Sequence, residues 1–213
     1  MFEIRKFKET DLEFKELARI DNLVNHDSID HPDDDKRDWF LRDKSFVRDR
    51  LLLYDEDIAV GVIYYSQGRE ENCRTAFFTM NIDPKFNVEE SRLLLYNAML
   101  TEIDKFHCNK IYTNVYEHSN YDLVKEFLIS KDFKHVQTNR EYTCNIKNID
   151  LKKYKPLLNQ LKLAGINFYD SKEEMKDWPN HYEKLEELTW TYHQDFPIPD
   201  GIKHTRTPFK QAL

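Results

Sequence analysis

The chain opens with a segment in which apolar and charged residues alternate. Residues 2–7 follow the two-residue repeat of a strand that buries one face. Thr10 or Asp11 can then cap a helix, because both side chains accept a backbone hydrogen bond at a helix start. Three apolar residues of this helix are expected to face inward: Leu12, Leu17 and Ile20. The first unit is therefore a strand followed by a helix.

An acidic stretch and three strand-like segments follow. Residues 30–38 are rich in aspartate and contain Pro32, which favours a helix start because carboxylates stabilise the positive end of the helix dipole. This second helix is expected to carry three aromatic residues: Trp39, Phe40 and Phe46. Strands are predicted at 50–54 and 58–65, joined by a three-residue hairpin turn, and at 74–82. These segments predict an antiparallel sheet.

Apolar residues at helical spacing then predict a long central helix. Its stripe consists of Leu93, Tyr96, Met99 or Leu100, Ile103 and Phe106. A strand is expected at 110–116, and the helix that joins it to strand 74–82 makes the two a parallel, right-handed crossover unit. Ser119 or Asn120 can cap the next helix. Two further strands are predicted to close the series: 133–137 and 141–146.

A separate helix is predicted after this series. Asp150 can cap it, and Pro156 must then lie in its first turn, where a missing N–H does no harm. Gly165 stands where the apolar pattern stops, as glycine often does after a helix. We interpret 150–164 as a linker helix.

The last part of the chain repeats the order of the first. A strand at 166–169 and a helix opened by Trp178 and Pro179 follow each other as the first strand and helix do at 2–24. This weak self-similarity predicts two domains: a complete one at 1–149 and the incomplete start of a second at 165–213.

Composition supports a packed core and argues against several classes of partner. Hydrophobic residues make up 40% of the 213 residues and aromatic residues 14%, which is ample for a globular core. The formal charge is −7 with a pI near 5.6, so neither nucleic acid nor an anionic membrane is expected as a partner. The longest apolar runs are strand-sized and the first residues do not form a signal peptide, which predicts a cytoplasmic protein.

Glycine and cysteine usage excludes further classes. Only four glycines occur, and none lies in a phosphate-cradling pattern, which disfavours a dinucleotide fold or a nucleotide triphosphatase. The three cysteines are widely spaced: Cys73, Cys108 and Cys144. Their spacing indicates neither a disulfide framework nor a zinc site, and we interpret them as buried thiols.

The loop before the central helix has the position of an anion site but not its usual residues. A strand, a short loop and a helix N-terminus direct orphan N–H groups and the helix dipole at one spot. Residues 87–92 read Asn-Val-Glu-Glu-Ser-Arg, without the glycines that let a phosphate approach closely. Glu89 and Glu90 stabilise the helix start and repel an anion there. This loop favours weak or absent cofactor binding.

The element order and the stretch from Ile82 to Phe133 resemble the GNAT superfamily of acetyl-CoA-dependent N-acetyltransferases. In that family the motif Arg/Gln-x-x-Gly-x-Gly/Ala opens the central helix and binds the pyrophosphate of the cofactor. Three residues match the strand end that precedes the motif: Ile82, Pro84 and Phe86. The basic, first-glycine and second-glycine positions of the motif are occupied here by Asn87, Glu90 and Arg92.

This resemblance implies a fold, an activity and a cosubstrate. The fold is α/β (α+β), a mixed, largely antiparallel sheet of six to seven strands flanked by helices, with a partial second repeat. The activity is transfer of an acetyl group from acetyl-CoA to an amine. The residues implied to bind the cofactor are Asn81, Ile82, Asn87, Ser91, Arg92 and Asn120. Because tandem members often pair a degenerate half with a catalytic one, the altered loop implies that 1–149 is the degenerate half.

Acetyl transfer requires a group that deprotonates the amine and one that protonates the leaving thiolate. Tyr121 is the candidate acid, with Tyr116 as an alternative, and Glu117 is the candidate base, with His118 as an alternative. Two ordinary explanations compete with these roles. The chain contains 12 tyrosines, and charged pairs in such loops are commonly just solvated.

One polar cluster lies between the first two helices: His26, Asp27, Asp30 and His31. Its spacing suits no metal pattern, so no metal is expected and a polar surface loop is the ordinary interpretation. In the GNAT resemblance this connection borders the acceptor site. Asp30 and His31 are therefore candidates for binding a small-molecule or peptide amine acceptor.

A second function from another class stays open. The missing glycines, and the absence of a tyrosine at the position where the family carries its acid, also suit a non-catalytic GNAT-like interaction or structural module. Exposed aromatic residues in an incomplete second domain favour self-association, which makes a homodimer possible: Trp178, Trp190 and Tyr192.

Overall fold

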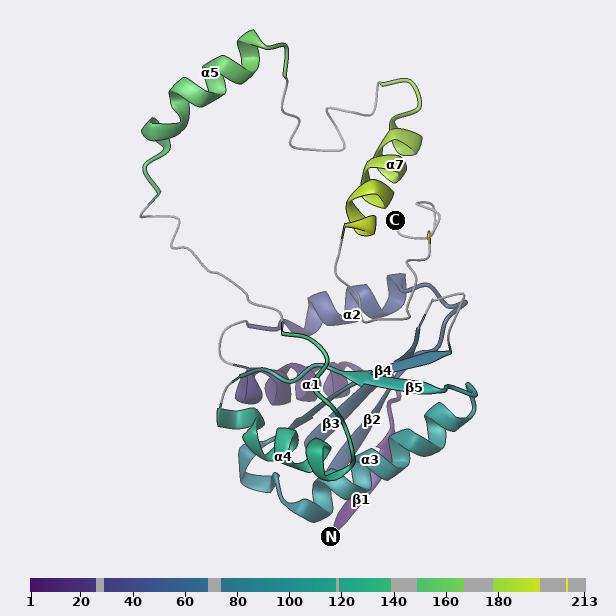
Figure 1. The fold of residues 1–213 in the computed structure, drawn as a ribbon. Helices are drawn as coiled ribbons and strands as arrows, with labels where there is room; N and C mark the ends of the chain where they lie inside the picture. Colours follow the sequence, from purple (N-terminus) through teal and green to yellow (C-terminus); the bar gives the residue numbers. More distant parts are fainter. Residues whose placement is uncertain are drawn as a thin grey trace. The chain divides into compact units, whose positions relative to one another are not determined.

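The computed structural model describes residues 1–25, 29–68, 74–117, 119–138, 149–166, 178–195 and 206, and the chain divides into two units. The larger unit contains β1 (Phe2–Lys6), α1 (Asp11–Val24), α2 (Pro32–Leu41), β2 (Arg48–Asp55), β3 (Ile58–Gln67), β4 (Thr75–Ile82), η1 (Pro84–Phe86), α3 (Glu89–Asp104), β5 (Lys110–Thr113), η2 (Ser119–Tyr121) and α4 (Asp122–Ser130) (Figure 1). The second unit contains η4 (Leu151–Tyr154), α5 (Lys155–Leu163) and α7 (His181–Gln194).

The sheet of the larger unit has five strands in the order β1-β2-β3-β4-β5. Neighbours from β1 to β4 are antiparallel, and β5 is parallel to β4 because α3 carries the chain back across the sheet. The mixed, largely antiparallel α/β fold is therefore confirmed. The described part of the chain does not reach six or seven strands: 133–137 form no strand, and 141–146 lie outside the described residues.

Phe133 shows why the pattern at 133–137 was misleading. Asp132 has a positive φ of 63°, which turns the chain after α4. The Phe133 ring then packs edge-on against Phe78 and Tyr96, at centroid distances of 5.8 and 6.4 Å. Its apolar character therefore reflects packing on β4 and α3, and strand pairing is not needed to bury it.

The β2–β3 hairpin is tighter than the sequence suggested. Asp55 pairs with Ile58, so that only Glu56 and Asp57 form the turn, and Glu56 has a positive φ of 55°. The expected three-residue connection is therefore wrong by one residue. The register shifts between Leu53 and Tyr54, the irregularity of a β-bulge, which increases the local twist of the sheet.

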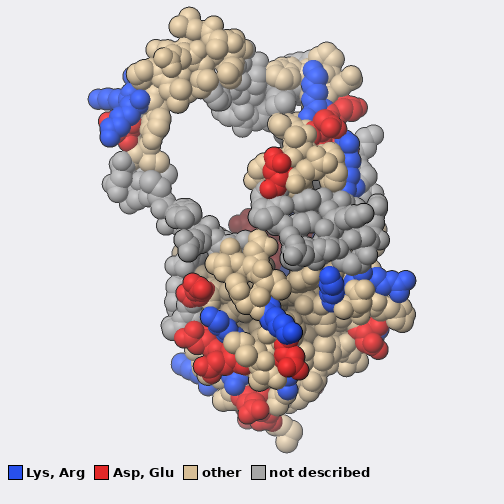
Figure 2. Space-filling view, in the orientation of Figure 1, with Lys and Arg blue, Asp and Glu red and all other residues tan. Residues whose placement is uncertain are grey.

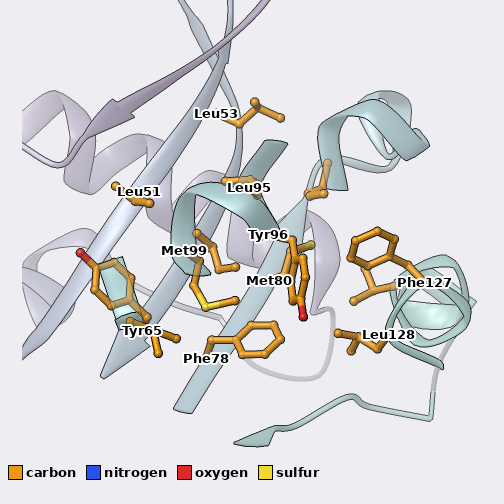
Figure 3. Packing of buried hydrophobic residues seen from close by; sticks show 14 of the residues in the cluster. Leu51, Leu53, Tyr65, Phe78, Met80, Leu95, Tyr96, Met99, Phe127 and Leu128 are labelled. Atoms are coloured by element: carbon orange, nitrogen blue, oxygen red, sulfur yellow. The ribbon is translucent and has the colours of Figure 1, made fainter. Parts of the chain in front are cut away.

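Alternating residues of the strands supply two hydrophobic cores on opposite faces of the sheet. Leu51 and Leu53 face α3 and α4, whereas Leu52 between them faces α1 and α2. Figure 3 shows the larger core, in which Leu95 and Met99 of α3 lie over the sheet. Each fully buried side chain of this size contributes about 1.5–3 kcal/mol relative to exposure. The sheet thus fixes α1 and α3 on its two faces.

Helix α1 starts as the sequence predicted. Thr10 is the N-cap and forms a capping box with Glu13, in which each residue satisfies a backbone N–H of the other. Leu17 and Ile20 are fully buried, but Leu12 is 68% exposed. The expectation for Leu12 is wrong because it lies in the first turn, on the side of α1 that faces away from the sheet.

The second helix is shorter than expected. Trp39 is buried, but Phe40 is exposed and Phe46 lies beyond the end of α2 at Leu41. Of the three aromatic residues, Trp39 therefore anchors this helix in the core.

The second unit is described by itself. Asp150 accepts a hydrogen bond from the N–H of Lys152 at 3.1 Å, Pro156 lies in the first turn of α5, and Gly165 follows with a positive φ of 79°. All three features of the predicted helix are therefore present, and α7 matches the helix predicted after Trp178. Within 166–169, residues 167–169 lie outside the described part.

Surface charge and hydropathy add two observations. Figure 2 shows acidic and basic side chains interspersed over the sheet-containing unit on the visible face. None of the helices that the structure describes is both long and apolar enough to span a bilayer.

Candidate functional site

Strands β4 and β5 part before β4 ends. Their parallel pairing runs from Thr75–Lys110 to Phe78–Thr113, whereas β4 continues to Ile82. Over residues 79–82, β4 pairs only with β3 among the described strands. The backbone groups of Met80 and Ile82 therefore have no neighbouring strand among the described residues, whereas those of Thr79 and Asn81 face β3. A ligand beside this open edge can accept hydrogen bonds from the two N–H groups.

Helix α3 begins after the turn that follows this open edge. The N–H of Arg92 bonds the carbonyl of Val88 at 3.2 Å, as in a regular helix. Within the described part of the chain, the N–H groups of Glu89, Glu90 and Ser91 make no hydrogen bond. Three donors and the positive end of a helix dipole thus meet at one place.

Ser91 holds the start of α3 in place. Its buried Oγ accepts a hydrogen bond from the N–H of Val88 at 3.1 Å and lies 2.8 Å from the carbonyl of Phe86, to which it donates. This hydroxyl is therefore occupied within the loop. A ligand can reach Ser91 through its backbone N–H.

Arg92 and Asn87 contact each other beside the first turn. Nη1 of Arg92 donates to Oδ1 of Asn87 at 2.7 Å and to its carbonyl at 3.0 Å, while Asn87 is buried. Nε of Arg92 is buried and has no acceptor among the described residues. Glu89 and Glu90 are exposed, so their carboxylates can turn into solvent. The first turn therefore fits an anionic group through backbone donors and the nearby guanidinium.

A polar network crosses the opposite face of the sheet. Tyr64 OH donates to Oδ2 of Asp21 at 2.5 Å, and Nδ2 of Asn81 donates to Oδ1 at 2.7 Å. Oδ1 of Asn81 in turn accepts from Tyr121 OH at 3.3 Å. The network joins α1, β3, β4 and the start of α4. Asn81 belongs to the stretch of β4 that extends beyond its pairing with β5.

Burial perturbs the titration of this network. The pKa of Asp21 is raised to about 6, mainly by burial, which outweighs the hydrogen bonds from Tyr64 and Asn81 that favour the carboxylate. Burial also raises the pKa of Tyr64 and of Tyr121 above the usual tyrosine value. Both tyrosines therefore keep their protons at neutral pH, while Asp21 can gain or lose one.

Asp21 and Tyr64 also line a cavity of about 240 Å³ between α1, α2 and the sheet. The remaining wall carries carboxylates from the α1–α2 connection and α2, two arginines and one histidine: Asp30, Asp34, Asp35, Asp38, Arg48, Arg50 and His31. Arg50 is already neutralised by Asp35, with both nitrogens within 2.6 Å of its oxygens. The cavity is therefore acidic, which suits a cationic ligand.

The structure brings some of the predicted site residues together and separates others. Asp30 and His31 line the acidic cavity, and Asn22 holds the backbone of Asp30 there through hydrogen bonds of 2.8 and 3.0 Å. Asn120 instead donates to the carbonyl of Val24 at 3.0 Å and satisfies the end of α1. Glu117 is exposed in the loop after β5.

Ile82, predicted to contact the cofactor, is buried in the core under α3. Its side chain is therefore committed to packing, and only its backbone belongs to the open edge. Tyr116, the alternative acid, is exposed, and its ring lies 5.4 Å from that of Tyr121. His118 lies outside the described residues.

Sequence reasoning missed Asp21 and Tyr64. Asp21 lies four residues after Leu17 and three before Val24, so it falls on the inward stripe of α1. A charged residue at an inward helix position signals a buried polar site, because a lone buried carboxylate needs compensation. Tyr64 is two residues from Val62 on the same strand face. Each position could have been recognised as a polar residue on an inward face. The sequence could not show that the two side chains contact each other, because they are 43 residues apart in the chain.

No metal site is indicated in the described residues. No group of three or more histidine, cysteine, aspartate or glutamate side chains is arranged there so that it could hold a metal ion. His26 and Asp27, two members of the cluster considered earlier, lie outside the described part. We therefore interpret the aspartates of the cavity as polar lining residues and not as metal ligands.

Comparisons with known proteins show a fold that this chain shares with solved acetyltransferases. No protein-family model and no curated protein matches the chain. Among solved structures, it is similar to an aminoglycoside acetyltransferase, meta-AAC0020, from an uncultured soil metagenomic sample in complex with sisomicin. The TM-score is 0.53 at 14% identity, over 68% of this chain and 97% of the other.

A second similar structure carries a cofactor analogue. It is AAC(6')-Iy in complex with the bisubstrate analog CoA-S-monomethyl-acetylneamine, with a TM-score of 0.51 and 14% identity, over 68% of this chain and 99% of the other. At this identity the likeness concerns the fold. The splayed β4 and β5, the β4-α3-β5 crossover and these neighbours together show that the chain has the fold of the GNAT acetyltransferases.

Proposed function

We propose that this chain is an acyl-CoA-dependent N-acetyltransferase of GNAT type. The carrying observation is the open edge of β4 at 79–82, followed after η1 by three N–H groups at the start of α3 that make no hydrogen bond within the described part of the chain. An edge with free hydrogen-bonding groups suits an extended, amide-rich chain, and a helix start suits a phosphate. The two lie in the order that a CoA thioester requires.

Acetyl-CoA is the proposed cosubstrate. When bound, it supplies an activated acyl group to the amine, with a thiol as the leaving group. The N–H groups of Glu89, Glu90 and Ser91 would hold its pyrophosphate, with Arg92 beside them. Met80 and Ile82 would contribute through the backbone groups that they direct away from β3, whereas the backbone of Asn81 faces β3. Tyr121, which remains protonated, is the proposed proton donor for the departing sulfur.

The proposed acceptor is a cationic amine, either a small molecule or a peptide. Asp30 and His31 lie on the wall of the acidic cavity, which favours a positively charged ligand. The aminoglycoside acetyltransferase meta-AAC0020, which this chain resembles in fold, was solved in complex with sisomicin. That likeness supports a cationic amine as the class of acceptor.

A non-catalytic role is the second candidate, and one observation favours it. Glu90 and Arg92 stand at the positions where the family carries glycines, and the Arg92 side chain is turned back onto Asn87. In this case residues 1–149 form the degenerate half of a tandem protein, 150–164 the linker and 165–213 the start of a second domain. Homodimer formation belongs to the same proposal.

Calorimetric titration of acetyl-CoA into the full chain tests the two candidates. Saturable binding in the micromolar range, followed by thiol release in the presence of spermidine or sisomicin, supports the enzyme. Absence of heat, together with self-association by light scattering, supports the non-catalytic module.

A further inference from the structure

The partly buried carboxylate of Asp21 lies where an acceptor amine and an acyl thioester would meet. It lines the acidic cavity on one side and is hydrogen-bonded to Asn81 on the other. Asn81 belongs to the stretch of β4 that β5 leaves unpaired. Asp21 thus lies on the proposed acceptor cavity and, through its hydrogen bond with Asn81, contacts the part of β4 proposed to bind the cofactor.

From this geometry we propose that Asp21 is the residue that removes a proton from the acceptor ammonium. The inference rests on the proposed acetyltransferase function and names its base. The base is supplied by α1, in place of the exposed Glu117 that the sequence suggested.

The hydrogen bonds of Asp21 suit this role. Tyr64 and Asn81 each donate to one carboxylate oxygen, so the group is fixed in orientation while its remaining lone pairs stay available. Neither partner takes the proton away, since Tyr64 keeps its own at neutral pH and the Asn81 amide does not titrate. Asp21 can therefore accept a proton from a ligand in the cavity.

The proton balance closes with the groups present. The ammonium R–NH₃⁺ gives one proton to Asp21, which leaves R–NH₂ with a lone pair for the new C–N bond. As the C–S bond breaks, Tyr121 is the proposed donor of a proton to the departing sulfur, and the second proton that the nitrogen loses restores the Tyr121 hydroxyl. Asp21 then releases its proton to solvent through the cavity, which restores the carboxylate.

Other charged groups near Asp21 can also change activity in this pH range, so the test must distinguish their effects from that of Asp21. Asp30 and Asp35 face it from the α1–α2 connection and α2, Arg50 from β2, Tyr64 from β3 and Tyr121 from the start of α4. The negative charges of Asp30 and Asp35 favour protonation of Asp21. His31 lies on the same cavity wall and is the other residue to control for.

The test measures kcat and KM between pH 5 and 8.5, with acetyl-CoA and spermidine or sisomicin as acceptor. Wild type is expected to lose activity as the pH falls through about 6, because protonated Asp21 can no longer accept a proton. This fall in kcat toward low pH is the acidic limb of the pH profile. Asp21→Asn should reduce kcat at pH 7.5 by about 100-fold or more and abolish that limb of the profile. A matched change on the same helix, Asp11→Asn, removes an exposed carboxylate and should leave both unchanged.

Tyr64→Phe gives a second readout that does not depend on the folding of Asp21→Asn. Removing the Tyr64 hydroxyl deletes a hydrogen bond that lowers the pKa of Asp21, so the acidic limb should move to higher pH while kcat at alkaline pH is retained. Tyr54→Phe, on the neighbouring strand β2, is the matched control. His31→Gln should leave the limb in place.

Several results overturn the inference. An active wild type with an unchanged limb in both Asp21→Asn and Tyr64→Phe excludes Asp21 as the base. Loss of the limb in Glu117→Gln or His31→Gln assigns it to that residue instead. A wild type that binds no acetyl-CoA and releases no thiol with either amine overturns the proposed function as well, which distinguishes the two failures.

Discussion

Arg50 and Asp35 form a two-pronged ion pair, with Nη1 and Nη2 of the arginine 2.5 and 2.6 Å from the two carboxylate oxygens. Arg50 is 2% exposed and its guanidinium lies 4.5 Å from the centre of the Trp39 ring. The pair therefore connects α2 to the middle of β2. It also gives the wall of the acidic cavity a fixed position.

Asp35→Ala should destabilise the larger unit strongly, because it leaves the buried Arg50 charge without its partner. We expect a loss of about 3 kcal/mol in the free energy of unfolding, measured by urea denaturation. Asp38→Ala on the same helix is the control, since its contact with Arg37 is exposed and should contribute less than about 1 kcal/mol. Equal losses in the two variants would contradict this account.

Asn120→Ala separates a structural role from cofactor binding. The Asn120 amide satisfies the carbonyl of Val24 at the end of α1, so its loss should reduce stability by about 1 kcal/mol in thermal or urea unfolding. The Kd for acetyl-CoA, measured by calorimetry, should remain that of the wild type. A weakened Kd with unchanged stability would restore the cofactor role that the sequence suggested.

Glu90→Gly tests whether the altered loop limits cofactor binding. Glycine removes a carboxylate next to the proposed phosphate position and a Cβ from the first turn of α3. The acetyl-CoA association constant should rise roughly fivefold, since one unit charge at a few ångströms is worth about 1 kcal/mol. Glu90→Gln removes the charge alone, so comparison of the two separates repulsion from backbone access. No gain in either variant would mean that the carboxylate turns fully into solvent.

The raised pKa of Asp21 also predicts how stability depends on pH. Because the pKa of this carboxyl is about 6 in the folded chain and near 3.8 when unfolded, its contribution to stability is complete below pH 3.8 and is lost as the pH rises through 6. The penalty above pH 6 amounts to about 3 kcal/mol. Asp21→Asn should therefore gain stability relative to wild type between pH 4 and 7, measured by urea unfolding at each pH. A pH-independent difference would contradict the shift.

Local sequence signals found most elements of the larger unit. The Thr10 capping box, the apolar stripe of α3 and the alternation in β2 and β3 are each encoded within a few residues. The strand at 133–137 was predicted wrongly because this prediction also used only the local pattern. The spacing of apolar residues cannot distinguish pairing with a strand from packing of the Phe133 ring against the core.

The candidate site was less accessible to sequence reasoning. The anion-binding position at the start of α3 followed from the order of strand, loop and helix, and Asp30 and His31 were selected as acceptor candidates from their position in the chain. Asp21 was overlooked because its chemistry depends on Tyr64 and Asn81, which are 43 and 60 residues away in the chain.

The sequence by itself determined the starts of α1 and α3, the strand faces and the loss of glycines at the cofactor loop, because these depend on neighbouring residues. The expected cap of α4 by Ser119 or Asn120 was wrong, since Tyr121 precedes this helix without a side-chain cap. The tertiary structure decided which polar side chains act together. It placed Asp21 between the acidic cavity and the open edge of β4, and it committed Asn120 to the end of α1. The physical reason is that burial and long-range hydrogen bonds, which set the pKa and the available lone pairs of a group, arise only when the sheet brings distant elements together.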